Sequence, residues 1–159
     1  EYFITDISHD SHANSIGSRF EMWQTAWQIF LDNPLIGVGW GNYQEHAKIL
    51  VEKGLRNASA SNWSHPHNQF LSSMVSVGIL GLVATLLLFL MPVIIFIRVI
   101  KSPARTDDVK NIALAGLIMA VGFMIFNLSE SFLERSRTVG FFVFYLAVCM
   151  AGIREKANC

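Results

Sequence analysis

Residues 70–97 form the stretch FLSSMVSVGILGLVATLLLFLMPVIIFI, which contains no charged residue. A bilayer core about 30 Å thick is crossed by about 20 apolar residues in a helix. The stretch therefore predicts a transmembrane helix with residues to spare, either tilted or beginning outside the hydrocarbon. Pro92 is expected to kink this helix, because proline lacks the N–H that a helix interior uses.

Two further uncharged runs follow, at 112–128 and 138–153. The first is about as short as a span can be, and a helix as short as the second must thin the bilayer or lean on its neighbours. We therefore predict an all-α fragment of a polytopic membrane protein with three spans. The remaining segments are a loop domain with short helices at 1–69, a loop at 98–111, a turn at 129–137 and a tail at 154–159.

Basic residues predict the orientation of these spans. The loop at 98–111 and the tail at 154–159 contain Arg98, Lys101, Arg105, Lys110, Arg154 and Lys156. Short loops rich in Lys and Arg face the cytoplasm. We therefore expect residues 1–69 and the 129–137 turn on the opposite side, which in a bacterium is the periplasm. Arg135 and Arg137 in that turn weaken the asymmetry without reversing it.

The composition favours the same class. Apolar residues make up 52% of the 159 residues and charged residues only 15%, below the roughly 25% of an average soluble domain. Twelve basic and 12 acidic residues give zero formal charge, so nucleic acid is not an expected partner. Cys149 and Cys159 have the spacing of neither a disulfide framework nor a metal site. Because the chain begins at Glu1 without a leader pattern, we expect a piece of a longer protein.

The first helix of the loop domain is predicted at 19–32. Ser18 and Glu21 match a capping box, and aromatic residues recur behind them at three- and four-residue steps. This boundary places Arg19 in the first helical turn, where a cation is disfavoured by about 0.3 to 1 kcal/mol. An arginine beside a helix N-terminus forms a site for phosphate or pyrophosphate. The alternative is an exposed arginine that simply reaches water.

A glycine-rich turn, IGVGWGN, follows this helix. We predict a tight turn with exposed backbone amides, including that of Gly39, covered by Trp40. Asn42 and Glu45 then predict the start of a second helix. The spacing of the glycines does not match a dinucleotide-binding fingerprint.

The sequence HPHN, from His65 to Asn68, directly precedes the first span. We expect Pro66 in the first helical turn and His67 beside it at the membrane surface. There the helix dipole opposes protonation, and a neutral imidazole suits a general base. The alternative is an interfacial histidine without a chemical role. A zinc site is disfavoured, because histidines two residues apart share no helical face and no third ligand is spaced to join them.

Two further pairs have local interpretations. Glu130 and Glu134 are one helical step apart at the outer end of the second span. The carboxylate of Glu130 either orients an arginine or histidine or is an ordinary solvated charge. Gly78 and Gly81 are small enough to let another helix approach the first span closely.

The order of these features resembles the C-terminal part of the bacterial O-antigen ligase and polymerase family. In that family an arginine precedes a tryptophan-containing helix, followed by a P-x-x-G-x-G turn, an H-N-x-x-L element and a span with G-x-x-G. The corresponding residues here are Arg19, the turn at 34–39, the segment 67–71, and Gly78 with Gly81. The resemblance covers nearly the whole chain.

The resemblance implies a GT-C-like glycosyltransferase in the bacterial inner membrane, which takes a glycan from undecaprenyl pyrophosphate on the periplasmic side without a metal or nucleotide cofactor. Arg19 would hold the donor pyrophosphate, and His67 would activate the acceptor or assist the leaving group. The other candidate substrate-binding residues are His65, Asn68, Gly39, Trp40 and Glu130. An N-terminal transmembrane bundle and membrane lipids would complete the site, so the fragment alone is expected to be inactive.

Several functions remain open at this point. In a ligase the acceptor is a sugar hydroxyl of the lipid A core, and in a polymerase it is another lipid-linked glycan. We favour the ligase, because the loop is short and its elements are closely spaced. A transporter is disfavoured because no span has a charged residue at its centre. A non-catalytic membrane partner would tolerate alanine at both Arg19 and His67.

Overall fold

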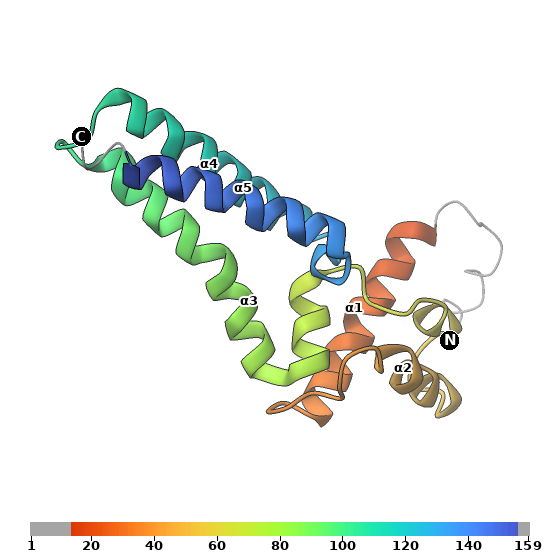
Figure 1. Ribbon diagram of the computed structural model, residues 1–159. Coiled ribbons are helices and arrows are strands. Elements are labelled where there is room, and N and C mark those ends of the chain that lie inside the picture. The colour runs from red at the N-terminus through yellow and green to blue at the C-terminus, as the bar shows by residue number, and fades with distance from the viewer. Residues whose placement is uncertain (1–13, 156–159) are drawn as a thin grey trace.

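The computed structural model describes residues 14–155, whose regular elements are all helices joined by turns and loops; this range contains no strand. The helices are α1 (Asn14–Asp32), α2 (Tyr43–Glu52), η1 (Ala58–Ser61), α3 (Gln69–Lys101), α4 (Asp107–Phe126), η2 (Phe132–Glu134) and α5 (Ser136–Glu155), where η denotes a short 3-10 helix. Figure 1 shows α3, α4 and α5 side by side, with α1 and α2 gathered at one end of them. The predicted all-α class is confirmed.

Three helices of the described chain are long and apolar enough to cross a membrane: Gln69–Lys101, Asp107–Phe126 and Ser136–Arg154. Each extends beyond its uncharged run, because charged residues are stable in terminal turns. Asp107 and Asp108 occupy the first turn of α4, and Arg98 and Lys101 the last turn of α3, positions that the helix dipole favours. Hydropathy alone therefore placed these charged ends too far inward, whereas α4 ends at Phe126, two residues before the end of its uncharged run.

Aromatic packing joins the three long helices. The buried ring of Phe89 on α3 lies 5.5 Å from that of Phe142 on α5, and Phe142 stacks on Phe123 of α4 at 4.6 Å. The Phe96 ring lies directly on Gly116, where any Cβ would overlap it. Close approach of α3 and α4 therefore depends on a glycine, as it commonly does between membrane helices.

The basic loop and the loop domain lie at opposite ends of this bundle. The connection from α3 to α4 and the C-terminal end of α5 lie at one end, and α1 and α2 at the other (Figure 1). This is the relative arrangement that the charge pattern predicts. The compartment that each end faces stays a prediction.

α1 begins at Asn14, upstream of the predicted capping box. Ser18 and Arg19 therefore lie inside the helix, and both the capping box and the first-turn position of Arg19 are wrong. A serine and a glutamate three residues apart also fit a helix interior, so the pattern alone does not mark a terminus. α1 packs its buried face, including Met22 and Ala26, against α2.

α3 is broken at Gly78, whose φ of 68° and ψ of −152° are non-helical. The turn after α1 fills this break. The N–H groups of Val38 and Gly39 donate to the carbonyls of Val75 and Ser76 at 2.8 and 3.0 Å. These bonds satisfy carbonyls that a broken helix leaves without intrahelical partners.

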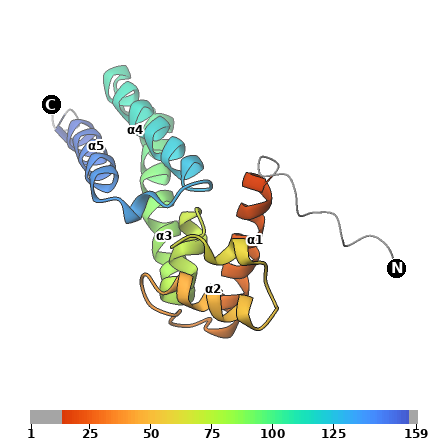
Figure 2. The same cartoon turned by 90° about the vertical axis from the view of Figure 1, so that its right-hand side faces the viewer.

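The break corrects two sequence predictions. The turn amides of Val38 and Gly39 are engaged rather than exposed. Gly78 admits the backbone of Leu35 rather than another helix, since a Cβ there would overlap it. Pro92 lies inside α3 with helical dihedrals, and a kink there stays a prediction. Figure 2 shows α1 and α2 lying against the N-terminal part of α3, which precedes the break at Gly78.

Candidate active site

Two segments meet at the end of the bundle nearest α1, namely residues 64–68 before α3 and residues 127–135 between α4 and α5. The backbone N–H of Gln69 donates to the Asn127 carbonyl at 2.9 Å, and Gln69 Oε1 accepts from the Leu133 N–H at 2.9 Å. Gln69 is fully buried, so water does not compete for these bonds. The bonds hold the two segments together as one unit.

Asn68 is the N-cap of α3. Its Oδ1 accepts from the N–H groups of Phe70 and Leu71, and its Nδ2 donates to the Leu128 carbonyl at 3.0 Å. Both ends of the amide are thus engaged and the residue is buried. Asn68 was predicted to bind substrate, and its observed contacts fix the start of α3 instead. Because α3 begins after it, the prediction that Pro66 occupies the first turn is wrong.

His67 adopts a φ of 48°, a left-handed conformation found at no other non-glycine residue of the described chain. Such a conformation costs on the order of 1 kcal/mol or more and persists only where the surroundings impose it. Here the Trp23 indole Nε1 donates to the Pro66 carbonyl at 3.0 Å, and Asn68 caps the next helix. The strained backbone turns the imidazole toward the 127–135 segment.

His67 Nδ1 lies 3.5 Å from Glu130 Oε1, a distance that is long for a hydrogen bond. The ring also contacts His65 at 4.4 Å and the edge of Trp63 at 5.0 Å between centroids. Burial, followed by the charges of His65 and Arg19, lowers the pKa of His67 below its ordinary 6.5, against the opposing effect of Glu130. His67 is therefore largely neutral near pH 7.

Arg19 approaches His67 from α1. It precedes Trp23 by four residues, so the two side chains lie on the same face of the helix, and Trp23 bonds to the residue before His67. The charge of Arg19 contributes to lowering the pKa of His67. Arg19 therefore lies near enough to act on His67 electrostatically, although it is not at a helix N-terminus.

Glu130 lies between a histidine and an arginine. Its Oε1 faces His67, and its Oε2 lies 3.6 Å from an Arg135 guanidinium nitrogen. Of the two interpretations that the sequence left open, this geometry favours a carboxylate that orients a histidine and an arginine.

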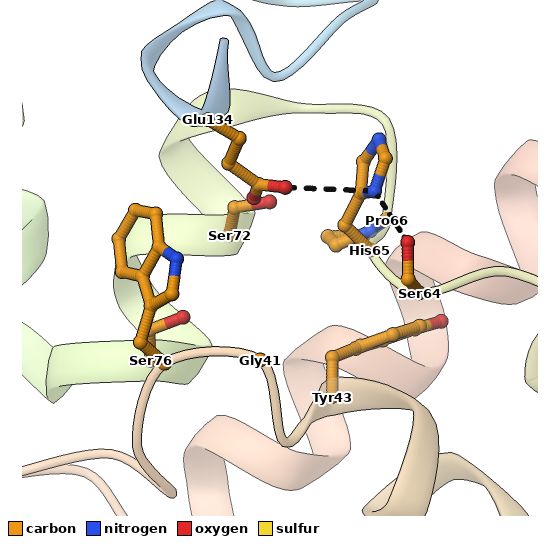
Figure 3. A pocket seen from close by; sticks show the side chains of 9 residues that line it. Gly41, Tyr43, Ser64, His65, Pro66, Ser72, Ser76 and Glu134 are labelled. Carbon is orange, nitrogen blue, oxygen red and sulfur yellow. Dashed lines mark hydrogen bonds and ion pairs between the residues drawn. The ribbon is translucent and has the colours of Figure 1, made fainter. Parts of the chain in front are cut away.

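A second histidine–carboxylate pair lies beside the first. His65 Nδ1 is 3.5 Å from Glu134 Oε2 and 3.0 Å from the Ser64 hydroxyl. Figure 3 shows Glu134 and Ser64 reaching the same edge of the His65 ring. The pairs His65–Glu134 and His67–Glu130 therefore lie side by side. The two histidines are two residues apart in the sequence, and the two glutamates are four residues apart.

A small pocket of about 90 Å³ opens beside His65 (Figure 3). It is lined by Trp40, Gly41, Tyr43, Ser64, His65, Pro66, Ser72, Ser76 and Glu134. Trp40, predicted to cover the glycine turn, is 59% exposed at this pocket. Gly39 does not line it.

One ligand atom from each of His65, His67 and Glu130 lies within 4.8 Å of the others. The sequence disfavoured a zinc site because no third ligand was spaced to join the two histidines. That premise is wrong, because Glu130 comes from a loop distant in the sequence. The general-base step of the proposed function is carried by side chains alone and uses no metal ion.

Sequence reasoning missed Gln69, Glu134 and Ser64 as parts of the site. Gln69 could have been noticed as a polar residue at the start of a long apolar run. Glu134 was seen only through its spacing from Glu130. No sequence signal pairs either carboxylate with a particular histidine. The pairing depends on the tertiary contact between the end of α4 and the start of α3.

These features define a class: an all-helical, multi-pass membrane protein with an arginine, two histidines and two carboxylates at one end of its spans. The O-antigen ligase family model matches residues 2–86, and the chain belongs to this family. Its members are glycosyltransferase-like enzymes.

The chain is also similar to an uncharacterized protein of Haemophilus influenzae. The two are 28% identical over 133 residues, which cover 84% of this chain and 33% of the relative. The chain therefore spans about a third of the length of this relative.

Proposed function

We propose that this chain forms the C-terminal catalytic part of an O-antigen ligase. The full enzyme would transfer a glycan from undecaprenyl pyrophosphate to a sugar hydroxyl of the lipid A core, at the periplasmic face of the bacterial inner membrane. The observation that carries the proposal is the convergence of Arg19, His67 and Glu130 at the end of the spans opposite the basic loop. Family membership supplies the reaction class.

His67 acts as the general base in this proposal. Its Nδ1 faces Glu130, so the proton resides there and Nε2 carries the free lone pair. Nε2 takes the proton of the acceptor hydroxyl as its oxygen bonds to the anomeric carbon of the donor. The bond from that carbon to the pyrophosphate breaks, and the imidazolium is stabilised by Glu130. General base catalysis contributes about 100- to 10,000-fold.

Arg19 serves the other side of the same reaction. Negative charge develops on the departing pyrophosphate, and a guanidinium binds two of its oxygens in parallel. A fixed cation near His67 also disfavours early protonation of the imidazole, as the lowered pKa of His67 indicates. One group thereby supports both leaving-group departure and the readiness of the base.

The proposal is tested in the full-length protein, since the N-terminal bundle is needed for the donor groove. Variants with alanine at Arg19 or His67 are introduced into a strain that lacks the gene. Each is expected to remain in the membrane and to leave the core without glycan. Retained glycan attachment in the double variant would refute the catalytic assignment.

A polymerase of the same family is the alternative function. The same deletion strain separates the two. Loss of a ligase leaves full-length glycan on the undecaprenyl carrier and a bare core, whereas loss of a polymerase leaves a core capped with one repeat. A core with a single repeat in the deletion strain would therefore support the polymerase in place of the ligase.

A further inference from the structure

The pocket beside His65 differs in charge from the surroundings of Arg19. Among residues 14–155, Glu134 is the only charged residue that lines it, and no lysine or arginine of this range does so. A donor diphosphate would gain no cation there and would be repelled by the carboxylate. The pocket therefore suits a different part of the reaction from the one that Arg19 serves.

The lining chemistry matches one sugar ring. Trp40 presents an exposed indole, a flat apolar surface on which the C–H face of a pyranose stacks. Ser76, His65 and Glu134 supply hydroxyl, imidazole and carboxylate groups for sugar hydroxyls. The cavity of about 90 Å³ is smaller than the range of about 300 to 1,000 Å³ for typical small-molecule sites, so it receives one face of a single ring rather than an oligosaccharide.

The position of the pocket links it to the proton-transfer step. The His65 ring lies on the pocket wall and contacts the His67 ring at 4.4 Å between centroids. A ring bound beside His65 therefore places one of its hydroxyls within reach of His67. The Gln69 and Asn68 bonds that hold the two loops together keep this relation fixed.

We propose that this pocket is the acceptor subsite, which binds one neutral sugar ring by stacking on Trp40 and by hydrogen bonds from its hydroxyls to Glu134. The assignment of the bound sugar as the acceptor rests on the proposed function. The carboxylate also selects among acceptors, because a phosphorylated or acidic sugar would bring a second negative charge against Glu134. The pocket thus recognises a neutral ring and rejects an anionic one.

Kinetics on the full-length enzyme test the subsite. Trp40→Ala and Glu134→Gln are expected to raise the KM for a neutral core oligosaccharide at least tenfold, with little change in the KM for the lipid-linked donor. Trp27→Ala and Glu45→Gln are the matched controls, since both residues are exposed and neither lines the pocket. Unchanged acceptor KM in both pocket variants, or a raised donor KM instead, would overturn the assignment.

Charge selection gives a second measurement. The wild-type enzyme is expected to prefer the neutral oligosaccharide to its phosphorylated form, and Glu134→Gln to reduce that preference several-fold. An unaltered preference would overturn the role of Glu134.

Calorimetry measures binding of the oligosaccharide to the full-length enzyme in the absence of donor. This measurement separates the subsite proposal from the proposed function. Binding that the Trp40 variant loses supports a sugar subsite even if transfer is absent. If the enzyme transfers glycan and the Trp40 variant binds the oligosaccharide as tightly as the wild type, the subsite proposal is refuted and the proposed function stands.

Discussion

The two histidine–carboxylate pairs are nearly identical in length and differ in their surroundings. Each places a carboxylate oxygen 3.5 Å from an imidazole Nδ1. His67 lies in a strained backbone conformation, and the charge of Arg19 acts on it. His65 instead bonds to the Ser64 hydroxyl and lines a pocket to which residues 14–155 contribute no lysine or arginine.

The difference shows how one short motif can divide its work. The pair beside Arg19 has the features that proton transfer requires, namely an imidazole facing a carboxylate and a lowered pKa of His67. The pair on the pocket has the features of ligand binding, namely an open space and several hydrogen-bonding groups. Substituting the two pairs separately tests this division.

The largest expected effect is that of His67→Ala. Loss of the base is expected to reduce the turnover number about 100- to 10,000-fold, measured as the initial rate of glycan transfer by the full-length protein at saturating substrates. His65→Ala is expected to act mainly on the KM for the acceptor. A larger fall in turnover for His65→Ala than for His67→Ala would reverse the assignment of the two pairs.

Arg19→Ala is expected to have the next largest effect. Removing a group that neutralises developing charge costs about 100- to 1,000-fold in turnover, and Arg19→Lys restores only part of it because lysine lacks the planar fork. The comparison is made with Arg98→Ala, at the opposite end of the bundle, which is expected to be nearly neutral. Equal losses at both positions would indicate a general effect of charge rather than pyrophosphate binding.

The pH profile sharpens the comparison further. The charged or titratable groups that face His67 are His65, Arg19 and Glu130. A base must be unprotonated, so kcat/KM rises with pH through the pKa of His67, and its acidic limb lies below the ordinary value of 6.5.

Glu130 raises the pKa of His67 against the other influences, so Glu130→Gln is expected to move this limb to lower pH while also lowering turnover. Glu134→Gln is the matched change in the other pair, and it is expected to leave the limb in place. A shift toward higher pH in Glu130→Gln would contradict the assigned contact.

The spans were predictable because apolar runs follow directly from the solvent that a bilayer provides. The helix ends were not, since Asp107 and Lys101 are charged and still helical. The break at Gly78 also escaped the sequence argument. Its cause is a turn more than 30 residues upstream, whose amides replace the missing helical donors.

Arg19 and His67 could be selected from the sequence, but the reasons given for them were partly wrong. Arg19 lies inside α1 and reaches the site because Trp23, one turn later, bonds to Pro66. His67 owes its lowered pKa first to burial. The carboxylates could not be paired with their histidines, because that pairing is a tertiary contact between the ends of α3 and α4.

Gln69→Leu is expected to have the smallest effect, and it weakens both pairs together. The substitution leaves the partly buried Leu133 N–H without its partner, at a cost of about 1 kcal/mol. We expect a lower melting temperature in detergent and a several-fold fall in transfer, since the two glutamates lose one of their links to the histidine segment. Gln28→Leu, on the exposed face of α1, is the control. If Gln69→Leu lowered turnover without changing the melting temperature, Gln69 would act on the substrate rather than as a link between the two loops.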